Sequence, residues 1–311
     1  MKVLSLFDGV SCARLALEKA GIPIEVYYAS EIDKYAIKVT QANRPDTIQL
    51  GSVTELYPTP NLHNVDLLIG GSPCQDLSIA KKDRKGLEGN RSSLFYEYVR
   101  ILNEVKPKYF ILENVASMPQ KDKDIISQTL GVQPVMINAS LVSAQNRKRL
   151  FWVGRRIDND NYEQVYVPQP EDKDIWYQDI IGKFDFNYEL SEKTKNIIKR
   201  NMQKSKQYFR IPNEDLTRIE KISYPSRIKQ HFGPSKIPTL TSSMGSGGNN
   251  VPVITQGGKI RKLTPIECER LQCMPDNWTN PTGDISNSQR YKMCGNAFNV
   301  EVVAHIIKQL K

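Results

Sequence analysis

Short apolar runs and longer amphipathic stretches alternate along the first half of the chain. Apolar positions recur at helical spacing from Cys12 to Ala20, just before Gly21, and again from Leu94 to Val105. Buried strands that alternate with such helices are typical of an α/β fold with a doubly wound, mostly parallel sheet. The strand-length apolar runs cover residues 2–7, 24–29, 65–69, 109–112, 135–139 and 150–153.

The periodic pattern is lost over the next hundred residues. Residues 157–186 are polar and irregular, and residues 191–203 form a basic helix candidate that begins at Ser191. Residues 242–250 are rich in Gly, Ser and Asn, a composition that predicts a flexible loop or hinge. We therefore expect a first domain over residues 1–155, followed by a smaller, irregular domain with its hinge over residues 156–260.

Regular signals return in the last fifty residues. Thr264 and Glu267, with Pro265 between them, form a capping box that predicts a helix ending at Leu271. A last helix is predicted over residues 300–307, where apolar positions again recur at helical spacing. We expect residues 261–311 to return to the first domain.

A thiol stands on a sharp turn after the apolar run 65–69. The run leads into Gly70, Gly71, Ser72, Pro73 and Cys74, so Cys74 lies at the carboxyl end of a buried strand. Ligands bind at that end of the strands in open α/β sheets. Free cysteines usually fill space in a core. The turn glycines, the proline and the polar loop of residues 78–90 instead favour a nucleophile at Cys74.

The first strand–helix–strand unit predicts a cofactor site at its first turn. The dinucleotide pattern G-x-G-x-x-G is absent, since Gly9 is the only glycine of this turn. Glu31 ends the second strand 22 residues after Gly9, where a carboxylate can accept hydrogen bonds from ribose hydroxyls. Both facts fit a nucleoside cofactor without phosphates, for which S-adenosyl-L-methionine is the obvious candidate.

The charge distribution favours a polyanionic partner. Of the formal net charge of +9, residues 191–236 supply +8, with twelve Lys and Arg against four Asp and Glu. Five cysteines without a C-x-x-C pair argue against a disulfide framework and a zinc site, and for a reducing compartment. The apolar start is too short for a signal peptide and no stretch is long enough for a membrane span, so we expect a cytoplasmic protein.

Three reactive features follow or precede strands of one predicted sheet: Cys74, Glu113, and the arginines Arg147 and Arg149. We expect them to meet at the edge where parallel strands have their carboxyl ends. No histidine stands beside the thiol, which argues against a protease. A thiolate, an acid and arginines are better suited to activating a pyrimidine, by thiolate addition at C6 and protonation at N3.

Five motifs follow one another along the chain: Gly71-Ser72-Pro73-Cys74-Gln75, Glu113-Asn114-Val115, Gln145-x-Arg147-x-Arg149, residues 261–272, and Gly295-Asn296-Ala297. In their order and spacing they resemble the motifs of C5-cytosine-specific DNA methyltransferases. The length and the single catalytic region are similar to bacterial or phage members, whereas the catalytic core resembles the animal de novo enzymes. The resemblance implies a Rossmann-like, S-adenosylmethionine-dependent methyltransferase domain in residues 1–155 and a target-recognition domain in residues 156–260.

The resemblance also implies residue roles in the reaction. Cys74 would attack C6 of a cytosine flipped out of duplex DNA, and C5 would take the methyl group of S-adenosylmethionine. Glu113 would contact N3 and the 4-amino group, and Asn114 would hold the loop geometry. Arg147 and Arg149 would position the base and stabilise the anions of the active site.

The cofactor would lie against Phe7, Gly9, Glu31 and Asn296 in such an enzyme. Ile32 and Ser52 stand at positions that contact the adenine in the family, where an aromatic residue and an aspartate are common. Ser11 likewise replaces the second glycine of the usual F-x-G-x-G. These departures concern the adenine contacts, since a serine hydroxyl accepts a hydrogen bond more weakly than a carboxylate does.

Two groups of residues would contact the DNA. The loop after the thiol would close over the flipped base, and the basic segment, residues 191–236, would contact phosphates. The expected DNA-binding residues are Gln75, Ser78, Arg84, Lys85, Lys199, Arg200 and Arg227.

The sequence thus predicts a sequence-specific DNA (cytosine-5-)-methyltransferase that acts on double-stranded DNA. We expect it to work as a monomer, without a metal or a membrane, in the cytoplasm of a bacterium or a phage-infected cell, as part of restriction–modification. The first alternative is a tRNA cytosine-5 methyltransferase, against which the extended basic segment argues. The second is a catalytically inactive DNA-binding relative, which the intact Cys74, Glu113 and Arg147 disfavour.

Overall fold

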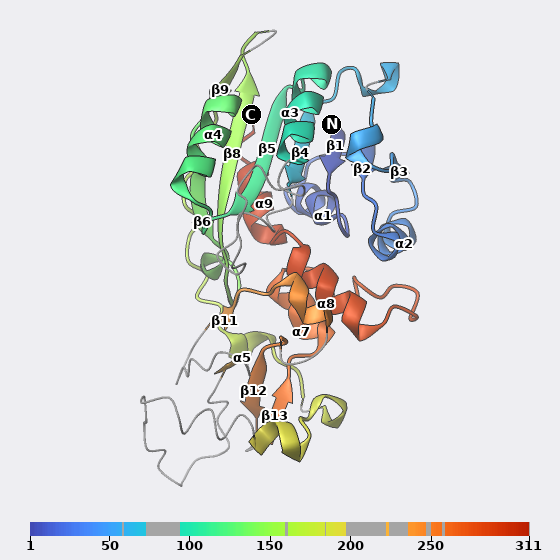
Figure 1. The fold of residues 1–311 in the computed structure, drawn as a ribbon, viewed down its shortest axis with the longest axis vertical. Coiled ribbons are helices and arrows are strands. Elements are labelled where there is room, and N and C mark those ends of the chain that lie inside the picture. Colours follow the sequence, from blue (N-terminus) through green and yellow to red (C-terminus); the bar gives the residue numbers. More distant parts are fainter. Residues whose placement is uncertain are drawn as a thin grey trace. The chain divides into compact units, whose positions relative to one another are not determined.

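A computed structural model of the chain shows two compact units, each described here by itself (Figure 1). The first comprises Met1–Ala139, Lys148–Glu171 and Phe298–Lys311, and the second comprises Ser140–Arg147 and Asp172–Ala297. The structure describes residues 1–57, 59–72, 94–158, 161–183, 185–196, 222–223, 236–246, 250–256 and 259–310.

The first unit is built on an eight-stranded sheet with the order β3-β2-β1-β4-β5-β8-β6, and β9 pairs with β8. β1 through β5 pair in parallel, so the predicted α/β fold with a mostly parallel sheet is confirmed. The strands are β1 (Lys2–Leu6), β2 (Val26–Ser30), β3 (Ile48–Gln49), β4 (Leu67–Gly71), β5 (Tyr109–Val115), β6 (Val135–Asn138), β8 (Lys148–Arg156) and β9 (Tyr162–Gln164).

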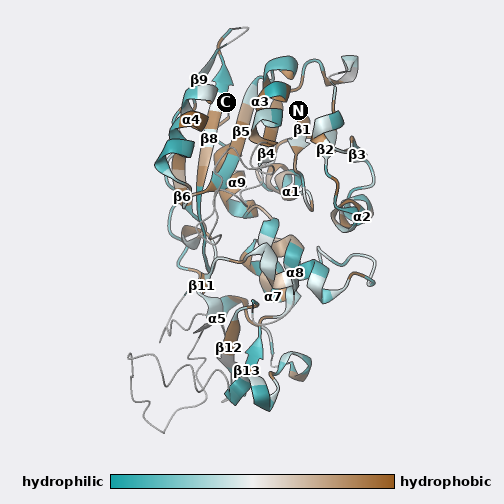
Figure 2. Cartoon of the chain, viewed as in Figure 1, coloured by the Kyte–Doolittle hydropathy of each residue, from teal (hydrophilic) through white to brown (hydrophobic). Residues whose placement is uncertain are grey.

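Helices supply the apolar surfaces that cover this sheet, whose strands are apolar along much of their length (Figure 2). The predicted face of α3 is confirmed, because Phe95, Tyr98, Leu102 and Val105 are buried in the core. α9 packs against α1. The helices of this unit are α1 (Cys12–Lys19), α2 (Lys34–Asn43), α3 (Leu94–Val105), α4 (Gln120–Leu130) and α9 (Val300–Ile307), with short 3₁₀ turns η1 (Val53–Glu55) and η2 (Pro60–Leu62).

The direction of β8 differs from the expectation. β8 runs antiparallel to both β5 and β6, with Arg149 opposite Val115. The start of β8 therefore lies at the same edge as the end of β5. Glu113 and Arg149 do meet at this edge, but through an antiparallel pair and not through two parallel carboxyl ends.

The second unit has smaller sheets and a helical core. β10, β12 and β13 form an antiparallel sheet, and β7 pairs with β11 in parallel. Tyr177, Leu240, Met244 and Leu271 are buried in its core. The elements are β7 (Gln145–Asn146), α5 (Tyr177–Ile180), η5 (Phe186–Tyr188), β10 (Ile222–Ser223), β11 (Ile237–Pro238), η6 (Ser242–Ser246), β12 (Val253–Gln256), β13 (Lys259–Lys262), α7 (Pro265–Leu271) and α8 (Asn287–Asn296), while η4 (Ala139–Leu141) spans the boundary between units.

The expected flexible loop over 242–250 is wrong for its first half. Residues 242–246 form η6, which packs against α8, and Met244 is buried. A Cβ on Gly245 would lie 2.6 Å from the Cβ of Lys292, so the glycine allows a close approach to α8 and does not mark a hinge. Residues 247–249 lie outside the described residues.

The local end signals of two helices are confirmed. Glu267 N donates to Thr264 Oγ1 and Thr264 N donates to Glu267 Oε2, so the predicted capping box opens α7. Thr194 N donates to Ser191 Oγ at 3.4 Å, and residues 192–196 are helical as far as the described part extends.

The compact units follow other boundaries than the expected domains. α7 and α8 belong to the second unit, and only residues from Phe298 onward return to the first. α8 is held there because it packs on η6 and α7. Compactness does not say which residues read DNA, so target recognition by residues 156–260 stays a prediction. Among the described residues, no helix is both long enough and apolar enough to span a membrane.

Candidate active site

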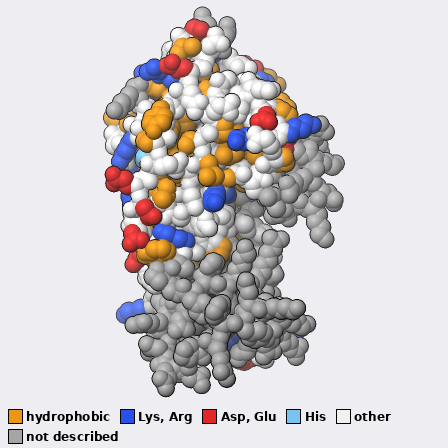
Figure 3. Space-filling model, turned by 90° about the vertical axis from the view of Figure 1, so that its left-hand side faces the viewer, with side chains coloured by type: hydrophobic (Ala, Val, Ile, Leu, Met, Phe, Trp, Pro, Cys, Tyr) orange, Lys and Arg blue, Asp and Glu red, His pale blue; other side chains and the backbone are white. Residues whose placement is uncertain are grey.

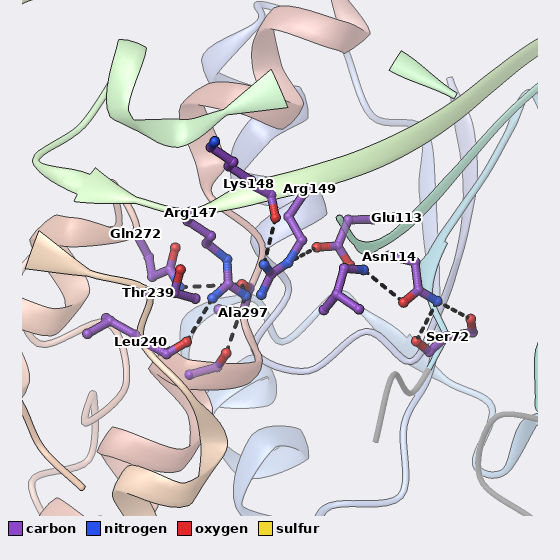
Figure 4. Close-up of polar contacts among 12 residues, drawn as sticks. Ser72, Glu113, Asn114, Arg147, Lys148, Arg149, Thr239, Leu240, Gln272 and Ala297 are labelled. Carbon is purple, nitrogen blue, oxygen red and sulfur yellow. Dashed lines mark hydrogen bonds and ion pairs between the residues drawn. The ribbon is translucent and has the colours of Figure 1, made fainter. Parts of the chain in front are cut away.

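The ends of β4 and β5 form the centre of the candidate site in the first unit. Gly71 and Glu113 are register partners in this parallel pair. The buried Asn114 donates from Nδ2 to Ser72 Oγ at 3.1 Å and to Ser72 O at 3.4 Å (Figure 4). Asn114 therefore ties the strand that carries Glu113 to the residue two positions before Cys74.

Gly71 allows two side chains to pack over the end of β4. A Cβ at this position would lie 2.8 Å from Cε1 of Phe298 and 3.0 Å from Oε2 of Glu113. Any larger residue would have to displace the ring or the carboxylate. Phe298 was not among the predicted site residues, although it directly follows the motif Gly295-Asn296-Ala297.

An ion pair holds the Glu113 carboxylate in place. Arg149 Nε lies 2.7 Å from Glu113 Oε1, and the two side chains are 14% and 13% exposed (Figure 4). Arg149 also donates from Nη1 to Lys148 O at 2.9 Å. With Oε1 paired and Oε2 over Gly71, this acid is presented at the sheet edge in one orientation. The structure thus brings together Glu113, Asn114 and Arg149 as predicted.

Arg147 has a different environment, in the second unit. Its buried guanidinium donates from Nη1 to Leu240 O at 2.9 Å, and from Nη2 to Ala297 O at 2.9 Å and Gly295 O at 3.3 Å. Arg147 thus binds three main-chain carbonyls, whereas the family resemblance implied that it positions the base.

The candidate cofactor turn has an unusual backbone. Phe7, Gly9 and Ser11 all have positive φ angles, of 56°, 61° and 57°. For Phe7 and Ser11 this conformation is uncommon, and such residues cluster at functional sites. A Cβ on Gly9 would meet no atom of the described residues within 4 Å, so the turn is open toward that part of the chain.

Glu31 closes this turn. Its Oε2 accepts a hydrogen bond from Gly9 N at 2.8 Å, and its Oε1 accepts bonds from the backbone of Ile32 and Asp33, each at 2.8 Å. The carboxylate is therefore part of the turn and not a solvated surface group. An open turn with an ordered acceptor beside it fits a nucleoside with ribose hydroxyls.

A buried carboxyl beneath the turn was missed by the sequence analysis. Asp8 accepts hydrogen bonds from Ser11 Oγ at 2.5 Å and Tyr27 Oη at 2.7 Å, and Ser11 Oγ also lies 3.0 Å from Thr40 Oγ1. Burial raises the pKa of Asp8 to about 6, against the lowering effect of its hydrogen bonds. Burial also raises the pKa of Tyr27 well above its usual value.

The other predicted cofactor residues lie in both units. Ile32 is 76% exposed beside Glu31. Ser52 follows β3, where its Oγ lies 2.7 Å from Thr54 Oγ1 and caps η1. Asn296 is exposed at the end of α8 in the second unit. Ile32 and Ser52 thus belong to the same unit as Phe7, Gly9 and Glu31, and Asn296 to the other.

The thiol and the predicted DNA-binding residues lie outside the described part of the chain. Their roles stay predictions, and the residues are Cys74, Gln75, Ser78, Arg84, Lys85, Lys199, Arg200 and Arg227. Within the described start of the basic segment, Lys195 is paired with Glu189 at 2.6 Å and Glu192 at 2.8 Å.

Charge is mixed on the face of the first unit in Figure 3. Lys and Arg side chains lie among Asp and Glu there, with hydrophobic side chains between them. The described part of this face therefore shows side chains of both charge signs and no patch of one sign. The face is consistent with the sequence count, which puts the positive excess in residues 191–236.

Comparison with known proteins identifies relatives over the whole chain. The family described as C-5 cytosine-specific DNA methylase matches residues 1–311. Type II methyltransferase M.Bsp6I of Bacillus sp. (strain RFL6) is 29% identical, with 100% of this chain and 98% of the relative covered. Type II methyltransferase M.NlaX of Neisseria lactamica is 28% identical, with 100% and 96% covered.

Solved structures share the fold at lower identity. A mutant of DNMT2 from Spodoptera frugiperda superposes with a TM-score of 0.69 at 21% identity, covering 99% of both chains. Dnmt2 methyltransferase of S. pombe superposes with a TM-score of 0.68 at 17% identity, covering 100% of this chain and 98% of that one.

Proposed function

Because the chain belongs to the C-5 cytosine-specific DNA methylase family and is a DNA (cytosine-5-)-methyltransferase, we propose which of its residues carry the transfer. Cys74 is the nucleophile, Glu113 the acid, and Arg149 the residue that orients Glu113. One observation carries this assignment. Arg149 holds the Glu113 carboxylate over Gly71, which lies on the adjoining strand β4. Gly71 precedes Cys74 by three residues in the sequence.

The residues account for each bond change at the base. The Cys74 thiolate forms a bond to C6, and the electron pair of the C5–C6 double bond is drawn toward N3, which Glu113 protonates. C5 then acts as the carbon nucleophile and takes the methyl group, while the carbon–sulfur bond of the methyl donor breaks. The C5 proton is lost to solvent, N3 returns its proton to the Glu113 carboxylate, and Cys74 leaves C6 as the thiolate, which restores the aromatic ring. The Glu113–Arg149 pair supports this scheme, because it holds the Glu113 side chain in one orientation at the sheet edge.

The turn at Gly9 is the proposed place of S-adenosylmethionine, which supplies the methyl group when bound. Phe7 and Gly9 would line the cofactor, and Glu31 would accept bonds from the ribose. Ile32 and Ser52 would lie near the adenine, and Asn296 is a further candidate from the family motif. The open space at Gly9 and the ordered Glu31 carboxylate support this assignment.

Double-stranded DNA is the proposed partner, and the target cytosine must leave the stack to reach Cys74. Gln75, Ser78, Arg84 and Lys85 would contact the DNA around the flipped base. The basic segment would position the duplex through phosphates, with Lys199, Arg200 and Arg227 as its candidates. The positive excess of residues 191–236 supports this role.

The biological setting follows from the relatives. M.Bsp6I and M.NlaX are named type II methyltransferases, and a relative from Bacillus phage SPR is named an orphan methyltransferase. We propose that this chain modifies a short DNA sequence as the methylating partner of a restriction–modification system. Bisulfite sequencing of DNA from cells that express the chain would identify the modified cytosine.

A transfer assay tests the proposed function. The protein is incubated with tritiated S-adenosylmethionine and either duplex DNA or tRNA, and Cys74→Ser serves as the inactive variant. We expect label in duplex DNA, none with Cys74→Ser, and a covalent complex on DNA that contains 5-fluorocytosine. Label in tRNA alone would contradict the DNA assignment. Full turnover by Cys74→Ser would contradict the nucleophile.

A further inference from the structure

Arg147 joins the two places where the chain leaves the second unit. One passage ends at Arg147 and continues as Lys148 in the first unit, and the other ends at Ala297 and continues as Phe298. Nη2 of Arg147 donates to Ala297 O at 2.9 Å. The last residues of both passages are thus hydrogen-bonded to each other, although they are 150 residues apart.

Two glutamines complete this arrangement, of which Figure 4 labels Gln272. Gln272 donates from Nε2 to Cys294 O at 2.7 Å and to Ala297 O at 3.4 Å. Gln145 accepts from Leu240 N at 3.0 Å and donates to Leu271 O at 3.2 Å. All three side chains are buried, and most of their partners are main-chain groups. We name Gln145, Arg147 and Gln272 the passage clamp.

A residue of the candidate site follows the end of each passage within two positions. Two residues after Arg147 comes Arg149, which pairs with Glu113 at 2.7 Å. One residue after Ala297 comes Phe298, whose ring packs on Gly71 beside Glu113. Consecutive Cα atoms are only about 3.8 Å apart, so one or two residues cannot absorb a shift of the clamped ends.

We propose that Arg147 is a positioning residue, which acts on the reaction through Arg149 and not by touching the base. The inference rests on the proposed role of Glu113. The family resemblance suggested instead that Arg147 positions the base. In the structure the terminal nitrogens of the buried Arg147 donate to three main-chain carbonyls. A guanidinium suits this task, since its planar fork donates in several fixed directions, whereas an ammonium is a point charge.

A double-mutant cycle on the full chain tests the proposal. The single-turnover rate of methyl transfer to duplex DNA is measured for Arg147→Met, Arg149→Met and the double variant, with DNA and cofactor saturating. If the loss is about 100-fold for Arg149→Met and about 10-fold for Arg147→Met, we expect the double variant to lose no more than about threefold beyond Arg149→Met, because coupled residues are not additive. A further full tenfold loss would show independent action and overturn the proposal.

Arg290→Met is the matched control for general damage to the second unit. Arg290 is also a buried arginine, paired with Glu269 at 2.8 Å, but it bonds to neither passage end in any described contact. We expect it to lower the melting temperature while changing the transfer rate less than about twofold. If Arg147→Met does not fold, Arg147→Lys replaces it in the same cycle.

Hydrogen–deuterium exchange gives a readout that needs no activity. In Arg147→Met, amides of residues 148–151 and 298–303 should exchange faster than in the wild type, and in Arg290→Met they should not. Faster exchange confined to residues 236–246 would overturn the inference even in an active enzyme. A wild-type protein that fails to methylate DNA would instead contradict the proposed function, and the exchange result would still decide the role of Arg147.

Discussion

Arg149 Nε lies 2.7 Å from Glu113 Oε1 across the antiparallel pair of β8 and β5, and little of either side chain reaches solvent. Glu113→Gln keeps the size of the side chain but removes the acid and the counter-charge. We expect the methyl-transfer rate to fall by about 10² to 10⁴, the range of a lost general acid. Stopped-flow or rapid-quench transfer to duplex DNA measures this. An unchanged rate would remove Glu113 from the chemistry.

Gly71→Ala tests the close packing over the end of β4. The new methyl would meet the Phe298 ring at 2.8 Å and the Glu113 carboxylate at 3.0 Å. We expect the unfolding free energy to fall by about 1–3 kcal/mol, the usual cost of an added methyl group in a well-packed core. We also expect slower methyl transfer. Urea unfolding and the transfer assay report the two effects. Gly182→Ala is the control, because its Cβ would meet no atom of the described residues within 4 Å, and equal losses in both variants would contradict the packing argument.

The raised pKa of Asp8 predicts a pH dependence of stability. Burial raises this pKa from 3.8 to about 6, so folding favours the protonated form. The resulting stability is fully present below about pH 3.8 and is lost as the pH rises through 6, by about 3 kcal/mol in all. Asp8→Asn cannot ionise, so the wild type should lose stability relative to it between pH 4 and 7. Parallel stability curves from urea unfolding at these pH values would contradict the assignment.

The α7 capping box predicts an effect on stability without one on chemistry. Thr264→Ala removes the acceptor of Glu267 N and should cost about 1 kcal/mol of unfolding free energy. Glu267→Gln should cost more, about 3–5 kcal/mol, because the buried Arg261 loses the negative charge that pairs with it at 2.7 Å. Thermal unfolding followed by circular dichroism ranks the two variants. The reverse order would show that the Arg261–Glu267 pair contributes little.

Sequence motifs identified much of the candidate site, because the reaction needs particular side chains at particular distances along the chain. Gly71, with which the nucleophile motif begins, and the Glu113–Val115 motif each end a strand in one sheet. Asp8 and Phe298 carried no such signal. An aspartate in a turn is usually solvated, and only the surrounding fold shows that Ser11 and Tyr27 bury this one.

The sequence by itself determined most strands of the first unit and the helices α1, α3, α7 and α9, since periodicity and capping act between residues a few positions apart. The capping box of Thr264 and the buried face of α3 are examples. The direction of β8 and the partners of Arg147 were decided only by the tertiary structure. An apolar run packs equally well in either direction, so its pattern carries no sign of direction. The carbonyls bound by Arg147 lie 93 to 150 residues away, and main-chain acceptors carry no mark in the sequence.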